Sequence, residues 1–189
     1  KYLEGKDNLD IISIFGKENL EEIQRIVSGV TGLAFVTVDY KGEPVTETIG
    51  FTDFCKKMRN DKLRQGLCKL SDASGAIIAA TSKQTSIYFC PCGLLEVAIP
   101  IVVNDRYLGG FVGGQVRCYD APPYVMRLSK NMSSLGREME EIDINSPEFE
   151  EALKDSKIYT YNEFLSISKL VEFIINQLTK KKIISKHNK

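Results

Sequence analysis

Two apolar runs joined by a short polar step constrain the fold of this chain more than any other feature. The runs cover residues 96–103 and 106–116, and Asn104 and Asp105 lie between them. Both of these residues tolerate a positive φ, which the commonest two-residue hairpin turns require. The stretch therefore predicts an antiparallel β-hairpin. Five glycines lie between Gly93 and Gly114, where they either form bulges or leave room for another group beside the backbone.

The segments before this hairpin predict a helix and a pair of strands. Apolar residues recur at helical spacing over residues 16–32, and Gly32 suits the position that ends a helix. Residues 33–38 predict a strand, and a turn returns the chain into a second strand over residues 43–48. Pro44 indicates that this second strand begins there or lies at the edge of a sheet.

Between residues 51 and 84 the apolar period changes from that of a strand to that of a helix. Thr52 is expected to cap one short helix, and Ser71 or Asp72 to cap a separate alanine-rich one over residues 73–82. Strands interrupted by a group of helices predict an α+β fold. Its sheet should be antiparallel, because the connections within each strand pair are too short for parallel crossovers.

Two further helices are expected after Cys118, a short one at residues 147–153 and a long one at residues 161–184. The long helix carries apolar residues at alternating spacings of three and four, a pattern that suits either packing against a sheet or the seam of a dimeric coiled coil that transmits a signal. Both interpretations stay open. The residues of this pattern are Phe164, Ile167, Val171, Ile174 and Leu178.

Composition excludes several classes of function. The 189 residues include 25 basic and 25 acidic side chains, so no extended nucleic-acid footprint is expected. No apolar run approaches the roughly 20 residues that span a bilayer, and no secretion leader is evident, which favours a cytoplasmic protein without membrane contact. His187 is the only histidine, so a histidine-based catalytic site has no base, and the glycine pairs lack the residues of a phosphate-binding loop.

Five cysteines, an odd number at wide spacing, indicate reduced thiols. Cys55, Cys68 and Cys90 fall on separate predicted elements that a fold can bring together. Three interpretations remain open: they are small buried hydrophobes, they line a pocket or redox-sensitive site, or with Cys92 they bind zinc or an iron–sulfur cluster.

Four other polar side chains are candidates for a binding site. Arg59 and Asp72 either form a charged pair that lines a pocket or face solvent as ordinary helix charges. The Tyr88 ring either walls a pocket or packs in the core of the sheet. Gln115, in an otherwise apolar strand, needs hydrogen-bond partners if it is buried, and a polar ligand is one such partner.

A series of short motifs, from residue 20 to the final helix, resembles the PocR sensory domain. The order and spacing of the motifs carry the likeness, with one departure: Pro91-Cys92 stands where the family commonly has a histidine. The motifs are Phe54-Cys55 with Arg59, Cys68 with Ser71-Asp72, Tyr88-x-Cys90 before Gly93-Leu94, Pro100-Ile101, Leu108-Gly109, and Gly113-Gly114-Gln115-Val116.

The resemblance implies a PAS-like antiparallel sheet with inserted short helices and a long C-terminal helix. It divides the chain into a sensory domain over residues 1–158 and a signalling or dimerisation helix over residues 159–189. It also implies a non-enzymatic bacterial sensor of short diols or related hydrocarbon derivatives that controls an AraC-type regulator or a histidine kinase. The ligand-binding set that we predict is Cys55, Arg59, Cys68, Asp72, Tyr88, Cys90, Leu94 and Gln115.

Overall fold

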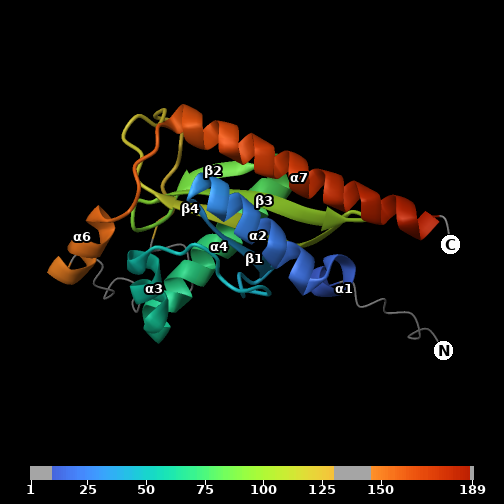
Figure 1. Ribbon diagram of the computed structural model, residues 1–189, viewed down its shortest axis with the longest axis horizontal. Helices are drawn as coiled ribbons and strands as arrows, with labels where there is room; N and C mark the ends of the chain where they lie inside the picture. The colour runs from blue at the N-terminus through green and yellow to red at the C-terminus, as the bar shows by residue number, and fades with distance from the viewer. Residues whose placement is uncertain (1–9, 130–145, 188–189) are drawn as a thin grey trace.

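The computed structural model describes residues 10–129 and 146–187, and confirms the α+β class (Figure 1). Four antiparallel strands form one sheet in the order β1-β4-β3-β2, an arrangement consistent with a PAS-like fold. The elements in chain order are α1 (Ile11–Phe15), α2 (Lys17–Thr31), β1 (Ala34–Asp39), α3 (Asp53–Asn60), α4 (Lys62–Ser82), β2 (Ser86–Phe89), β3 (Leu95–Val103), β4 (Arg106–Val116), α6 (Pro147–Lys154) and α7 (Tyr161–His187).

Helices cover both faces of the sheet, and side chains of alternating parity along each strand pack against them. Phe35 and Ile99 face the layer of α1, α2 and α7, whereas Val36 and Ala98 face the layer of α3, α4 and α6. This alternation is the expected consequence of the two-residue repeat of a strand. The sheet therefore separates two apolar cores, and the second one contains the candidate site.

The central hairpin is confirmed. Asn104 and Asp105 have φ values of 50° and 60°, the left-handed conformation that a tight hairpin turn requires. The turn pairs Val103 with Arg106 and so fixes the register of β3 on β4.

The predicted strand over residues 43–48 is wrong as a regular element. The segment pairs with β1 through two isolated bridges, at Pro44 and Ile49, and forms no continuous ladder with it. The backbone N–H of Val45 donates to the Thr37 carbonyl at 2.9 Å, whereas the Thr37 N–H donates to the Thr46 hydroxyl, also at 2.9 Å. A side-chain hydroxyl thus takes the place of one ladder bond, and the segment runs along β1 as an irregular edge.

The predicted break at Ser71 or Asp72 is also wrong, because α4 is one continuous helix. Its cap is Asp61, whose side chain accepts a hydrogen bond from the backbone N–H of Arg64 at 3.0 Å. Ser71 and Asp72 lie mid-helix and are buried. Tertiary contacts of Asp72, described below, outweigh its local preference for a cap.

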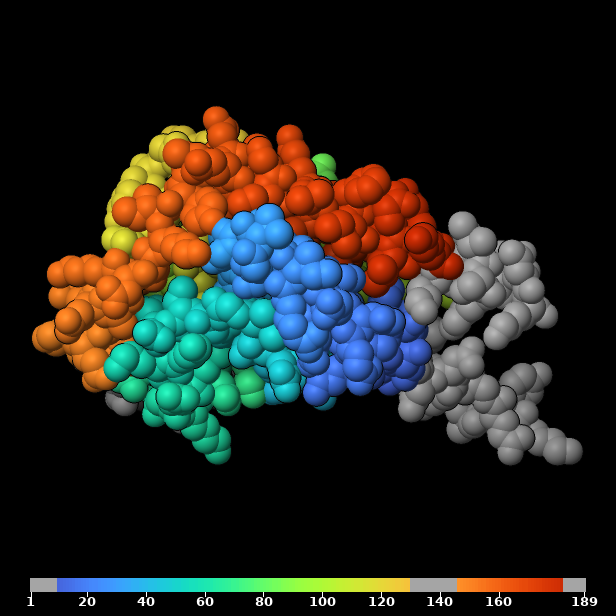
Figure 2. All heavy atoms as spheres, viewed as in Figure 1, coloured from blue at the N-terminus to red at the C-terminus, as the bar shows by residue number. Residues whose placement is uncertain are grey.

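The apolar face of α7 packs against the sheet, as one of the two interpretations predicted. Phe164 and Val171 are fully buried in the core beside β3, while Leu170 and Phe173 are exposed on the opposite side of the helix. On the face that Figure 2 shows, α2 and α7 form much of the surface. The dimer seam stays a prediction, and so does the domain boundary after residue 158.

A buried glutamine ties α2 to β1 and to its irregular edge. The Gln24 side chain is fully buried; its amide nitrogen donates to the carbonyl of Glu47 at 2.8 Å, and its oxygen accepts from the hydroxyls of Thr37 and Thr46. A buried amide with all these partners is a structural network, so Gln24 is not a candidate for ligand binding.

Candidate functional site

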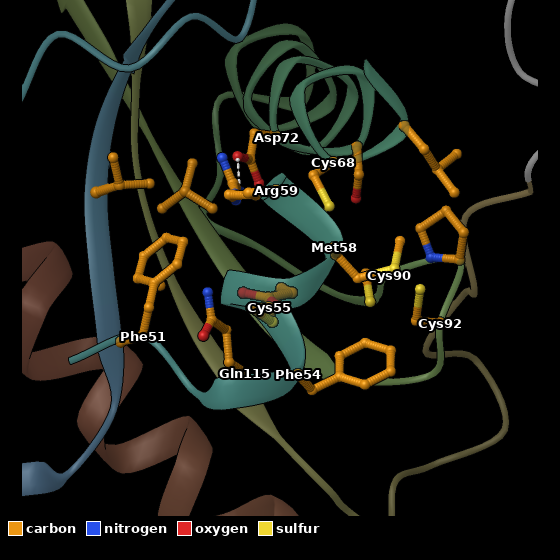
Figure 3. A pocket seen from close by; sticks show the side chains of 18 residues that line it. Phe51, Phe54, Cys55, Met58, Arg59, Cys68, Asp72, Cys90, Cys92 and Gln115 are labelled. Atoms are coloured by element: carbon orange, nitrogen blue, oxygen red, sulfur yellow. Dashed lines mark hydrogen bonds and ion pairs between the residues drawn. The ribbon is translucent and has the colours of Figure 1, made fainter. Parts of the chain in front are cut away.

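A cavity of about 40 Å³ lies between the sheet and the helices α3 and α4 (Figure 3). Since one water fills roughly 10–15 Å³ on this measure, the cavity has room for about three water-sized groups. Most of its wall is apolar, with Val36 and Val112 from the sheet and Phe54, Met58 and Leu67 from the helices. The cavity therefore has the size of a molecule with only a few non-hydrogen atoms.

Arg59 and Asp72 form the charged pair of this cavity. The Arg59 Nη2 donates to Asp72 Oδ2 at 2.7 Å, and the guanidinium lies 5.0 Å from the centroid of the Phe51 ring. Both side chains are largely removed from solvent, with 15% and 8% exposure. Burial raises the pKa of Asp72, and the neighbouring guanidinium opposes that shift.

Arg59 has hydrogen-bonding capacity that the protein does not use. Its Nε and Nη1 atoms are buried without a partner among the described residues. Buried donors without partners are costly, at about 1–3 kcal/mol each. At the wall of a cavity, these donors are available to the acceptor atoms of a water or of a bound molecule.

A β-bulge brings Gln115 to the cavity. The register of β3 on β4 shifts between Leu95, which pairs with Val116, and Glu96, which pairs with Gly114, so Gln115 is the extra residue. Its φ of 64° is a left-handed conformation that is uncommon outside glycine. Bulges often re-aim a side chain next to a functional site, and strain of about 1–3 kcal/mol persists only where the surroundings support it.

The Gln115 side chain links the bulge to α3. It is buried, and its Oε1 accepts hydrogen bonds from the Thr52 backbone N–H at 2.9 Å and from the Thr52 hydroxyl at 3.3 Å. The predicted cap is confirmed, because the same hydroxyl accepts from the Cys55 N–H at 3.2 Å. Gln115 thus fixes the start of the helix that carries Cys55 and Arg59.

All four thiols that the sequence singled out line the cavity: Cys55 from α3, Cys68 from α4, and Cys90 and Cys92 from the turn before β3. However, among the described residues no group of three or more cysteine, histidine or acidic side chains is arranged to hold a metal ion. The four-thiolate zinc or iron–sulfur set therefore has no support from the geometry.

The thiols differ in acidity because their surroundings differ. Burial raises the pKa of Cys55, and it raises that of Cys68 to about 12. Cys90 is the exception, since a hydrogen bond from the Cys92 thiol lowers its pKa. The same bond raises the pKa of Cys92, which has to give up the donated proton on ionising.

These differences predict the order of alkylation. At pH 8 in the folded protein, iodoacetamide should modify Cys90 at least about tenfold faster than Cys55 or Cys68, because the thiolate is the reactive form. Peptide mass spectrometry over a time course measures the order, and unfolding in denaturant should make the rates similar. Earlier modification of Cys55 or Cys68 would show that the order of acidity is wrong.

The structure brings six of the eight predicted ligand-binding residues to the cavity wall, and two lie elsewhere. Cys55, Arg59, Cys68, Asp72, Cys90 and Gln115 line the cavity. Tyr88 and Leu94 are fully buried in the core next to it and do not line it. The Tyr88 ring packs against Gly75, where an added Cβ would lie 2.3 Å from the ring, so α4 needs a glycine there.

Glu96 was missed by the sequence analysis. It lines the cavity from β3 and is 8% exposed. Strand alternation contains the signal that could have found it, since Glu96 has the parity of Ala98, and Val97 and Ile99 face the other core. A lone carboxyl within an otherwise apolar, buried strand is an unusual placement, and it makes Glu96 a candidate site residue.

Comparison with known proteins identifies a family and a relative of this chain. A family model described as the sensory domain found in PocR matches residues 13–183. The regulatory protein PocR of Salmonella typhimurium is 35% identical over 105 residues, which cover 56% of this chain and 35% of that protein. The matched part is thus about a third of the relative's length. No solved structure matches the chain.

The fold and its cavity, with the family match, define a sensory domain of the kind found in regulatory proteins. The chain belongs to the family of PocR sensory domains. Within the part of the chain that the structure describes, no helix combines the length and apolar character needed to cross a membrane.

Proposed function

We propose that this domain binds a small neutral molecule, a short diol or a related hydrocarbon derivative, in the cavity between the sheet and helices α3 and α4. The observation that carries the proposal is the pair of buried Arg59 donors without partners at the wall of a small, mostly apolar cavity. An apolar pocket with a few placed polar groups is the usual form of a ligand site. The domain acts as a cytoplasmic sensor and not as an enzyme.

The conformational change on ligand binding is transmitted through the C-terminal end of β4. Gln115 lies at the cavity, and Arg117, two residues on, donates hydrogen bonds to the carbonyls of Lys154 and Ser156 at 2.6 Å and 2.7 Å. The backbone of Arg117 also pairs with Lys157 and Tyr159, which precede α7. Because of these contacts, a movement of the bulge at Gln115 changes the position of the residues at the start of α7. Through α7 the domain controls an attached transcription regulator or histidine kinase, with a second copy as partner.

Only a ligand that favours one placement of α7 transmits a signal, because equal affinity for two states shifts no equilibrium. The affinity expected for such a ligand is modest. At no more than about 1.5 kcal/mol per non-hydrogen atom, a five-atom diol binds no more tightly than about 3 µM.

A calorimetric and thermal-shift screen of ethylene glycol, propylene glycol, glycerol and short aldehydes tests the proposal. At least one compound should bind with a dissociation constant between about 3 µM and about 1 mM. It should also raise the melting temperature with the logarithm of its concentration once that concentration exceeds the dissociation constant. A variant with Arg59→Ala is the control for general cosolvent effects, since those do not depend on the cavity. Absence of binding across the panel would contradict the proposal.

A further inference from the structure

A second polar position faces the cavity from the sheet, apart from the Arg59–Asp72 pair on the helices. It consists of Glu96 on β3 and Gln115 on β4, brought together by the bulge that offsets the two strands. Both side chains are more than nine-tenths buried. Two polar positions on opposing walls of one small apolar cavity suit a molecule that carries two hydrogen-bonding groups.

Gly114 makes room for this carboxyl. A Cβ at Gly114 would lie 3.0 Å from Glu96 Oε2 and 2.3 Å from the Leu95 carbonyl oxygen, and the glycine has a φ of 136°. A side chain there would clash with the strand and crowd the carboxyl. Gly114, the residue before Gln115, therefore allows both the backbone conformation of the bulge and the position of the Glu96 carboxyl.

Glu96 has no ion-pair partner among the described residues, although it is buried. Burial raises the pKa of Glu96 well above its usual value, and the positive charge of Arg59 and the Gln115 backbone N–H oppose this shift only in part. A buried carboxyl of this kind costs free energy unless something contacts it. Among the described residues, the Gln115 backbone N–H donates to this carboxyl, which keeps further acceptor capacity toward the cavity that it lines.

We propose that Glu96 is a ligand-contacting residue that, with Gln115, binds one hydroxyl of the ligand while Arg59 and Asp72 bind the other. The inference rests on the proposed function. It identifies the residues that make the site prefer a ligand with two hydroxyls to a ligand with one. The Glu96 carboxyl exchanges a hydrogen bond with the ligand hydroxyl, and the apolar wall contacts the carbon chain between the two positions. Glu96 is thus the residue that sets specificity.

Calorimetric titration with propylene glycol and with the two propanols, each lacking one of its hydroxyls, tests the assignment. The wild-type domain should prefer the diol by about 10-fold, the effect of one hydrogen bond to a group of this kind. Glu96→Ala should reduce that preference to about twofold. Glu96→Gln is the matched variant, because the amide keeps both shape and hydrogen bonding, and it should retain most of the preference.

The outcomes separate this inference from the function on which it rests. If the wild type binds no member of the panel, the proposed function fails and the role of Glu96 fails with it. If the wild type binds and Glu96→Ala keeps the full preference for the diol, the role of Glu96 alone is overturned. A Glu96→Ala variant that weakens diol and propanols equally would show a purely structural role, which also overturns the assignment.

Discussion

Replacing Arg59 with alanine is expected to abolish ligand binding and to lower the free energy of unfolding by about 3–5 kcal/mol. The large stability effect follows from Asp72, which is 8% exposed and has Arg59 as its ion-pair partner at 2.7 Å. Without the guanidinium, a buried carboxyl is left alone. Chemical denaturation measures the loss of stability, and calorimetry with the best compound of the screen measures the loss of binding.

A double variant separates the two effects. Arg59→Met combined with Asp72→Leu removes both charges, and replacing a buried pair by apolar residues of similar size is often neutral or stabilising. We expect this variant to recover most of the lost stability without recovering ligand binding. Lys56→Ala is the matched control, since the Lys56 side chain is 62% exposed and should change stability by no more than about 0.5 kcal/mol. Ligand binding by the double variant would contradict a role for Arg59 in recognition.

Truncating Phe164 in α7 should destabilise the domain by about 3–5 kcal/mol, the usual cost of removing a fully buried phenylalanine. Phe164 is 0% exposed and belongs to the core beneath the sheet. The measurement is denaturant unfolding of Phe164→Ala. A large effect is expected because α7 completes one of the two cores and is not a detached appendage.

Phe173 offers a control on the same helix. It is 62% exposed, so Phe173→Ala should change monomer stability by no more than about 0.5 kcal/mol. If α7 also serves as a dimer interface, this variant should weaken self-association in sedimentation experiments. Equal stability losses for the two variants would contradict the packing described for α7.

The sequence was sufficient for features with a local physical cause. Asn104 and Asp105 predicted the hairpin because both accept a positive φ, and Thr52 predicted a helix start because its hydroxyl can accept a backbone hydrogen bond. Local patterns gave wrong predictions where a contact between residues on different elements determines the structure. Asp72 has the preferences of a cap, yet its contact with Arg59 retains it within α4.

The candidate site was predictable in part. Its thiols and its charged pair fall on separate elements, and family resemblance indicated that they meet. The register shift at Gln115 was not visible, because a bulge depends on how two strands pair and not on the sequence of one. Tyr88 was assigned to the pocket, whereas the close approach of α4 at Gly75 places its ring in the core.

Amide-resolved magnetic resonance during titration with a bound diol tests the central claim most directly, because it shows where the ligand sits. We expect the largest shifts at Cys55, Arg59 and Gln115, around the cavity between the sheet and helices α3 and α4. Smaller shifts should follow at Arg117 and at the start of α7. A second groove, lined by residues that include Tyr40 and Tyr107, shares no lining residue with this cavity. Shifts concentrated at that groove, or no saturable shifts, would contradict the account.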